Sequence, residues 1–362
     1  MFISAVYLIV LIALLALGFL AQANPKTRIS RAGVYLTRPD PVLSFVLAAM
    51  LIVVAGLRFR VGTDYMAYYR TRVTDWKTVW DYLIHFREPG IRLLSKISTM
   101  IADDGAVLIF ISSVIIIGIY SLMIYRYSPL YLISMLLFAF LGDWTGSFNG
   151  IRQYLAAAIV FAGHRYILER KFIPYLLTVL LAMLFHRTAA VMILPYFLLA
   201  RKPDATQFVI LAAGAIIIRS SYTIVMNLIE LYKGSIINWS DAYMTREINP
   251  LRIAVSFIPV VLFFSTCDRE HMSKTQEFYI NSLFFHAFAM LASMGSAYFG
   301  RIGIYTSAMT CIGYGYMFRM IPQSKHRNVV MAAVLLVFLA YWIYSLQAGS
   351  LRDFHWIFER NV

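Results

Sequence analysis

The sequence is poor in charged residues. Asp, Glu, Lys and Arg make up only 14% of its 362 residues, whereas a soluble domain carries about 25%. It has only two cysteines, Cys267 and Cys311, and both lie in or beside apolar runs, so the sequence indicates no disulfide framework. No H-x-x-x-H, C-x-x-C or D-x-D spacing occurs. We therefore expect neither a bound metal nor any other cofactor.

Long apolar runs are what the chain has instead. Hydrophobic residues make up 60% of it, and the runs are continuous rather than alternating, which favours membrane helices over a β-barrel. The sequence predicts an all-α polytopic membrane protein in which residues 1–362 form a single membrane domain. We predict roughly twelve spans, within a range of roughly 11 to 14, at residues 2–20, 41–57, 105–125, 129–141, 152–168, 173–186, 188–200, 207–222, 250–266, 277–295, 302–318 and 329–346.

Lysine and arginine in the short loops predict the orientation of these spans. Basic residues recur after alternate spans, for example at 26–38, 170–171 and 201–202. Such loops remain in the cytoplasm. Both termini and the loop at residues 58–104 then lie on the outer side.

One segment of this outer loop has the pattern of a surface helix. At residues 88–100, Pro89 suits a first helical turn, and Ile91, Leu94 and Ile97 fall on one face. The segment is short and carries charges on the other face. It therefore predicts an amphipathic helix lying on the outer surface rather than a span.

Arginine is frequent on the predicted outer side, where positive charge is normally scarce. Its planar fork binds phosphate oxygens bidentately, so the set predicts an anionic ligand, a phosphate or diphosphate. Contact with lipid headgroups is the alternative. Because the basic residues are scattered between apolar runs, we expect no nucleic acid. Four of these arginines stand near helix starts that favour anions, namely Arg152, Arg187, Arg252 and Arg301.

The stretch R-F-R-V-G-T-D-Y-M-A-Y-Y-R at residues 58–70 follows the second span directly. If this stretch is extended, Arg58 and Arg60 lie on the same side and both can bind a diphosphate. Gly62 is expected to form a turn. Asp64 is a candidate general base, and a helix N-cap or a salt bridge is the alternative role. Tyr65 is a candidate sugar-stacking residue, and the interfacial aromatic belt is the alternative.

Three further motifs supply candidates on the same side. Glu88 is the second outer carboxylate, a candidate base or an N-cap. The polar, glycine-rich loop at 142–154 delivers Arg152 to the diphosphate and Gln153 to the substrate. His186 is a candidate base or phosphate ligand, with a buried structural histidine as the alternative. The remaining candidates are Arg301 for the diphosphate and Arg187, Tyr298 and Tyr305 for the substrate.

At these residues the chain resembles the EpsG branch of the Wzy-type polysaccharide polymerases. The family usually has serine where this chain has Thr188. The motifs occur in the order typical of that family and are R-F-R-V-G-T-D-Y-M-A-Y-Y (58–69), E-P-G-I-R-L-L (88–94), I-R-Q-Y-L-A-A-A-I (151–159), R-Y-I-L-E-R-K (165–171), L-A-M-L-F-H-R-T (181–188) and R-I-G-I-Y (301–305).

The resemblance implies a glycosyltransferase on the outer face of the bacterial cytoplasmic membrane, similar in architecture to class C glycosyltransferases. It implies that undecaprenyl-diphosphate-linked oligosaccharides are both donor and acceptor, and that a chain-length regulator is a possible partner. Two alternatives stay open. An O-antigen ligase uses a similar donor site, and a transporter or flippase of lipid-linked glycan is the non-enzymatic reading, which predicts charges deep within the spans.

Overall fold

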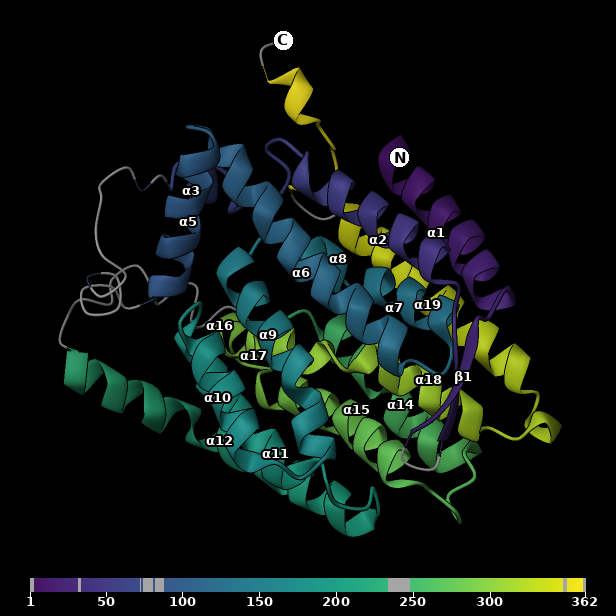
Figure 1. The fold of residues 1–362 in the computed structure, drawn as a ribbon. Coiled ribbons are helices and arrows are strands. Elements are labelled where there is room, and N and C mark those ends of the chain that lie inside the picture. Colours follow the sequence, from purple (N-terminus) through teal and green to yellow (C-terminus); the bar gives the residue numbers. More distant parts are fainter. Residues whose placement is uncertain are drawn as a thin grey trace.

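The computed structural model describes residues 3–31, 34–71, 73, 81, 88–233, 248–347 and 350–360. Figure 1 shows a bundle of helices with one short hairpin. All twelve predicted span positions are helical, and two of them are broken into pairs. The helices there are α1 (Ala5–Ala23), α2 (Pro41–Gly56), α6 (Gly105–Tyr127), α7 (Tyr131–Phe140), α9 (Ile151–Leu168), α10 (Phe172–Met183), η1 (Arg187–Ile193) with α11 (Leu194–Leu198), α12 (Ala205–Lys233), α14 (Pro250–Thr266), α15 (Lys274–Ala292), α17 (Ile302–Ser307) with α18 (Thr310–Met320), and α19 (Arg327–Gln347).

The helices have the apolar surface of a membrane protein. Among the described residues, three helices are long and apolar enough to cross a membrane, α1, α6 and α19, and several shorter apolar helices accompany them. Large apolar side chains point outward from the bundle, for example Phe45, which is 72% exposed. Apolar side chains exposed in this way are favourable in contact with lipid and unfavourable in contact with water. The total number of crossings stays a prediction.

A β-hairpin stands in the first basic loop, where the sequence analysis predicted no strand. β1 (Thr27–Arg31) pairs antiparallel with β2 (Val34–Arg38), with Thr27 opposite Arg38. Both strands contain β-branched or aromatic residues, which favour extended backbone. This short hairpin was not predicted, but the protein is otherwise helical, as expected for an all-α membrane protein.

A helix, α5 (Pro89–Ile101), forms where the amphipathic helix was predicted, and it packs on α6. Its place at the outer surface stays a prediction. Its buried side differs from the prediction. Ile91 and Leu94 are buried as expected, but Ile97 is 44% exposed, while Ser95 and Ser98 are buried. The buried positions follow the i, i+3, i+4, i+7 spacing of a helix face. The two serine hydroxyls are satisfied by backbone carbonyls, that of Ser95 by Thr71 at 2.6 Å.

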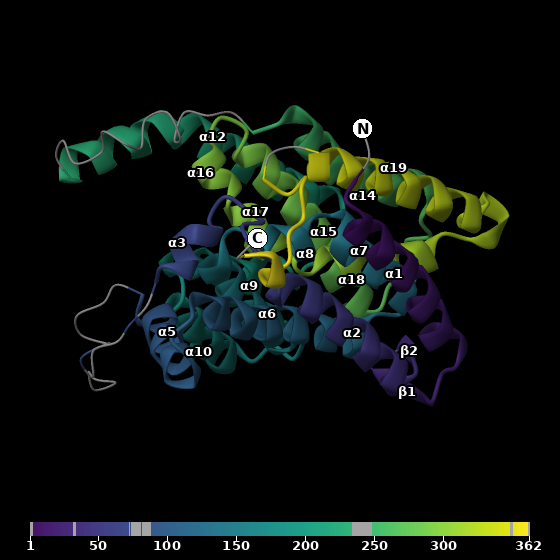
Figure 2. The ribbon, with the colours of Figure 1, turned by 90° about the horizontal axis from the view of Figure 1, so that it is seen from above.

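Helix α9 lies at the centre of the bundle and contacts α6, α10, α15 and α17 (Figure 2). Small residues allow the close approach: a Cβ added at Gly163 would lie 2.4 Å from a side-chain carbon of Thr178 on α10. His164 on the same helix is buried, and its Nε2 lies 2.8 Å from the hydroxyl of Tyr279. These contacts agree with a structural role for His164. They also make α9 a rigid support for the candidate site.

The two chain ends and α3 (Tyr65–Tyr69) lie toward one end of the bundle, and the hairpin lies toward the other (Figure 1). The segment at 350–360, which contains η3 (Ile357–Glu359), crosses the loop that follows α2. The amide of Phe59 donates to the carbonyl of His355 at 2.8 Å, and the amide of Ile357 to that of Leu57 at 2.7 Å. The C-terminal segment thus fixes the course of the stretch at residues 58–70.

Candidate active site

Arg58 anchors the loop after α2. It is only 1% exposed, and its guanidinium donates to the carbonyls of Val61 at 3.3 Å and Phe148 at 3.0 Å, as well as to that of Ala55. Burial lowers the pKa of Arg58 to about 10, so it stays charged at neutral pH. Because carbonyl oxygens engage all three guanidinium nitrogens, Arg58 links the loop after α2 to the loop that contains Phe148. We therefore do not retain it as a diphosphate ligand.

Arg60 points away from Arg58, contrary to the expectation that both lie on one side. Its backbone adopts a left-handed conformation, with φ of 55°, which breaks the extended course assumed from the sequence. Its guanidinium lies 5.2 Å from the ring of Phe59. There it lines a small cavity of about 350 Å³ that also involves Asp104 and Arg360. Arg60 and Arg58 therefore do not form one anion site.

The turn at Gly62 brings Asp64 to a larger cavity. Gly62 has φ of 101°, and the Thr63 amide that follows donates to Oδ1 of Asn149 at 2.7 Å. Asp64 stands before α3, and its backbone carbonyl accepts from the amides of Ala67 and Tyr68, but its side chain accepts no hydrogen bond from the helix backbone. Its Oδ1 lies 3.3 Å from the Thr63 hydroxyl. The predicted turn is confirmed, and the N-cap alternative for Asp64 is not observed.

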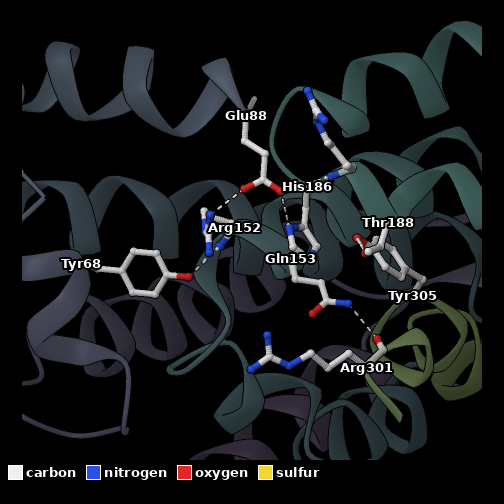
Figure 3. Close-up of polar contacts among 9 residues, drawn as sticks. Tyr68, Glu88, Arg152, Gln153, His186, Thr188, Arg301 and Tyr305 are labelled. Atoms are coloured by element: carbon white, nitrogen blue, oxygen red, sulfur yellow. Dashed lines mark hydrogen bonds and ion pairs between the residues drawn. The ribbon is translucent and has the colours of Figure 1, made fainter. Parts of the chain in front are cut away.

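Glu88 is the centre of a polar network that three elements build (Figure 3). Its carboxylate accepts from Nη1 of Arg152 at 2.6 Å and lies 2.7 Å from Nδ1 of His186. The backbone amide of Arg187 donates to it at 3.3 Å. The Tyr68 hydroxyl lies 3.5 Å from the backbone nitrogen of Arg152. Residues far apart in sequence, predicted separately as candidates, thus meet at one place.

The network decides what Glu88 can do. Burial raises the pKa of its carboxyl, but the hydrogen bond and charge of His186, the charge of Arg152 and the Arg187 amide outweigh burial, so the pKa lies below its ordinary value. A carboxylate that holds three donors is a poor proton acceptor. With Nδ1 committed to Glu88, His186 keeps Nε2 for a ligand. Glu88 is therefore better suited to orient His186 and Arg152 than to act as a base.

Gln153 links this network to the region of Arg301. The amide nitrogen of Gln153 donates to the carbonyl of Arg301 at 2.8 Å. Nearby, the hydroxyls of Thr188 and Tyr305 lie 3.0 Å apart, and Tyr305 is 1% exposed (Figure 3). Thr188 thus contributes a hydroxyl contact to Tyr305 at the edge of this network.

A cavity of about 590 Å³ opens beside these residues, within the size range of sites for small molecules. Of the predicted site residues, Asp64, Gln153 and Arg301 line it. Polar residues from several helices complete the wall, among them Asp143, Asn149, Tyr154, Arg252, Ser256, His286, Ser307 and Tyr341. Its lining includes two arginines, whose guanidinium groups can bind phosphate oxygens, and two carboxylates, which can accept from hydroxyl groups.

Three lining residues were missed as candidates. Asp143 lies in the polar loop at 142–154, which the sequence analysis recognised but from which it selected only Arg152 and Gln153. Arg252 was grouped with the outer arginines and not assigned a role. His286 falls within an apolar stretch of α15, where nothing in the sequence indicates that its Nδ1 lies 2.8 Å from the hydroxyl of Thr306. Only packing brings these three together.

Two other predicted residues of the described part of the chain, Tyr65 and Arg187, stand outside the cavity wall. Tyr65 is 1% exposed and stacks on Tyr69, with ring centroids 5.8 Å apart. It belongs to a buried aromatic cluster rather than to a sugar-stacking surface. Arg187 is exposed at the start of η1. Tyr298 lies in α16 (Ala297–Gly300), and its side chain falls outside the described part of the chain.

The family is decided by a sequence comparison. The model of the EpsG family matches residues 42–354, which include every motif discussed above. The chain belongs to the EpsG family. Comparisons with curated proteins and with solved structures gave no match. The predicted similarity to class C glycosyltransferases therefore stays a prediction.

Membership of the EpsG family agrees with the chemistry of the cavity. The family is associated with glycosyltransferase-like polysaccharide polymerases of membranes. This EpsG-family protein has both the apolar helices of a membrane protein and a polar cavity lined by arginines and carboxylates. It is thus a polysaccharide polymerase-like membrane protein.

Proposed function

We propose that this EpsG-family protein is a polymerase that joins undecaprenyl-diphosphate-linked oligosaccharide units on the outer face of the bacterial cytoplasmic membrane. The observation that supports it most is the cavity of about 590 Å³ in which Arg252 and Arg301 lie with Asp64 and Asp143. Guanidinium groups match a diphosphate, and carboxylates match the hydroxyl groups of a sugar. Apolar helices beside the cavity supply a surface for a polyprenyl tail.

In this reaction the acceptor hydroxyl oxygen attacks the anomeric carbon of the donor. The bond from that carbon to the diphosphate oxygen breaks, and the diphosphate leaves with the electron pair. Negative charge grows on the diphosphate, and groups that bind it more tightly as it leaves lower the barrier. We assign this role to Arg301 and Arg252 in the cavity and to Arg152 and His186 beside it, without a divalent metal.

A single displacement of this kind inverts the anomeric centre. The acceptor proton must pass to a basic group in the cavity. Glu88 is committed to three donors, so it orients its neighbours in this scheme. A carboxylate of the cavity wall is the proton acceptor.

A polymerase is favoured over a transporter by the position of the charges. Arg219 lies within the predicted span at 207–222, but α12 continues to Lys233. The Arg219 guanidinium lies against Gly295, where a Cβ would come within 3.0 Å of its Cζ, in the turn that follows α15. It therefore reaches a helix end rather than the middle of the bundle.

The test is reconstitution of the purified protein with a defined lipid-diphosphate-linked repeat unit. We expect polymer from wild type and a loss of at least about 100-fold in Arg301→Ala, because a leaving-group ligand contributes that much. Arg165→Ala is the matched control, since Arg165 stacks on Tyr166 at the far end of α9. Transfer of glycan to lipid A core instead of polymer would identify a ligase. Movement of the donor across the membrane without transfer would identify a transporter.

A further inference from the structure

Asp143 is a buried carboxyl group in the wall of the large cavity. It is 2% exposed and begins α8 (Asp143–Gly146), directly after Gly142, which has φ of 89°. This left-handed turn, which favours glycine, redirects the chain after α7. Trp144, which is fully buried, donates to the carbonyl of Leu51 at 3.3 Å and fixes α8 in place. The carboxyl of Asp143 is therefore held on a rigid support.

The two oxygens of this carboxyl group have different surroundings. Oδ1 accepts a hydrogen bond from the Ser307 hydroxyl at 2.6 Å. Oδ2 is buried and accepts no hydrogen bond from a described residue. A buried polar atom without a partner costs about 1–3 kcal/mol, and such atoms are rare in folded proteins. Asp143 also lines the large cavity, so a ligand bound there can supply the missing donor.

We propose that Asp143 is the proton acceptor of the transfer reaction, with the acceptor sugar hydroxyl donating to Oδ2; this rests on the polymerase function proposed above. As the hydroxyl oxygen forms its bond to the anomeric carbon, its proton moves to Oδ2. The bond from that carbon to the diphosphate breaks, and the diphosphate leaves with the electron pair. The carboxyl later releases the proton to water. Ser307 positions the carboxyl through Oδ1.

The surroundings of Asp143 suit this task. Burial raises the pKa of its carboxyl to about 7, although the Ser307 hydrogen bond and the charge of Arg252 counteract part of that rise. A base with a pKa near the working pH transfers protons efficiently. The other titratable or charged groups that face Asp143 come from four helices and are Tyr120 of α6, Tyr154 of α9, Arg252 of α14 and Cys311 of α18.

Asp64 is the rival, because it lines the same cavity. It is only half-buried, and the Thr63 hydroxyl at 3.3 Å from its Oδ1 belongs to the adjacent residue. Water can hydrate a half-buried carboxylate, whereas Oδ2 of Asp143 is a buried atom. The comparison of the two aspartates is therefore part of the test.

The first experiment measures polymer formation by reconstituted Asp143→Asn and Asp64→Asn from a defined lipid-diphosphate-linked unit. Asparagine keeps the shape of the side chain and a carbonyl oxygen for Ser307, but it cannot take the proton. We expect kcat of Asp143→Asn to fall roughly 100-fold or more, with KM within about threefold of wild type. Asp40→Asn is the matched control. Asp40 caps α2 by accepting from Val42 and Leu43, and asparagine caps equally well.

The second experiment uses the pH dependence of the rate. For wild type, the rate should fall as pH drops below about 7, because protonation removes the base. Ser307→Ala keeps the carboxyl but removes the hydrogen bond that stabilises its charged form. The acidic limb of the pH–rate profile, where the rate falls on its low-pH side, should therefore move to higher pH. If Ser307 only supported the fold, Ser307→Ala would change the amount of active protein and leave the pH of the acidic limb unchanged.

Several results would overturn the proposal. Near-normal kcat in Asp143→Asn contradicts it, and so does a rise in KM alone. A loss confined to Asp64→Asn transfers the role to Asp64. If Asp143→Asn does not purify as a monodisperse protein, an unshifted acidic limb in Ser307→Ala contradicts the proposal by itself. A wild type that makes no polymer contradicts the proposed function, whereas an active Asp143→Asn beside an active wild type contradicts this inference alone.

Discussion

The Glu88 network gives the sharpest prediction on stability. Glu88→Gln keeps the size of the side chain and removes its charge. The carboxylate now binds Arg152 at 2.6 Å and His186 at 2.7 Å, and a glutamine presents one carbonyl oxygen to these two donors. Its amide group faces the other contact, and it can donate to Nδ1 of His186 only when the ring proton is on Nε2. The variant therefore removes the charge that strengthens both contacts of this half-buried network.

The size of the effect follows from the contacts. A hydrogen bond to a charged group contributes about 1.5–3 kcal/mol, but the Arg152 side chain is 46% exposed, so water replaces part of its loss. Glu88 and His186 are only 14% and 17% exposed, so water replaces little of the free energy that their contact contributes. We expect a net loss of about 2 kcal/mol, which lowers the apparent melting temperature by about 2–4 °C in a chain of this length.

The assay is thermal unfolding of the detergent-solubilised protein, with Glu169→Gln as the matched control. Glu169 pairs with Lys171 at 2.8 Å, but the two side chains are 46% and 59% exposed, and exposed pairs contribute about 0–1 kcal/mol. In a double-mutant cycle, Glu88→Gln and Arg152→Gln should couple by about 0.5–3 kcal/mol. Equal melting temperatures for Glu88→Gln and Glu169→Gln would refute the reasoning.

The pH dependence of this effect has a definite sign. The folded-state pKa of Glu88 lies below its ordinary value of 4.5. A carboxyl of this kind stabilises the fold at pH values above the unfolded pKa, and its contribution disappears as pH falls through the folded pKa. The difference in melting temperature between wild type and Glu88→Gln should therefore be full at neutral pH and shrink below about pH 4.5.

Three further predictions follow from the outer loops. Arg58→Lys should lower the melting temperature by several degrees, because a single ammonium nitrogen cannot reach the carbonyls that three separate guanidinium nitrogens contact, and unchanged stability contradicts the anchoring role. Gly62→Ala should cost about 1–3 kcal/mol in thermal unfolding, since φ is 101° and a Cβ would lie 2.8 Å from Oδ1 of Asn149. Glu359→Cys should react with an impermeant maleimide on intact cells and Lys171→Cys only after permeabilisation. The reverse labelling pattern would invert the proposed orientation.

Part of the candidate site follows from residue type and order. The outer carboxylate Glu88 and the residues Arg152 and His186 were selected one by one from short polar motifs between apolar runs, and the structure brings all three into one network. Apolar surroundings make isolated polar motifs conspicuous in a membrane protein. For this reason, residue type and position along the chain were enough to select Glu88, Arg152 and His186 as candidates.

Selection failed where the assignment depended on backbone geometry or distant packing. Arg58 and Arg60 were grouped because an extended strand places alternate residues on one side. The left-handed backbone of Arg60 separates them. His286 was not selected from the sequence, and only the packing of α17 places a hydroxyl beside it.

The sequence by itself determined the membrane class, the helices at all twelve span positions and helix α5, because hydrophobic burial and helix periodicity act locally along the chain. It also carried the motifs of the EpsG family. Only the tertiary structure decided which polar groups share a cavity. Asp143 meets Ser307 across a long stretch of chain, and Glu88 meets His186 likewise. Such contacts depend on how helices pack, and packing is a property of pairs of distant segments that no local pattern records.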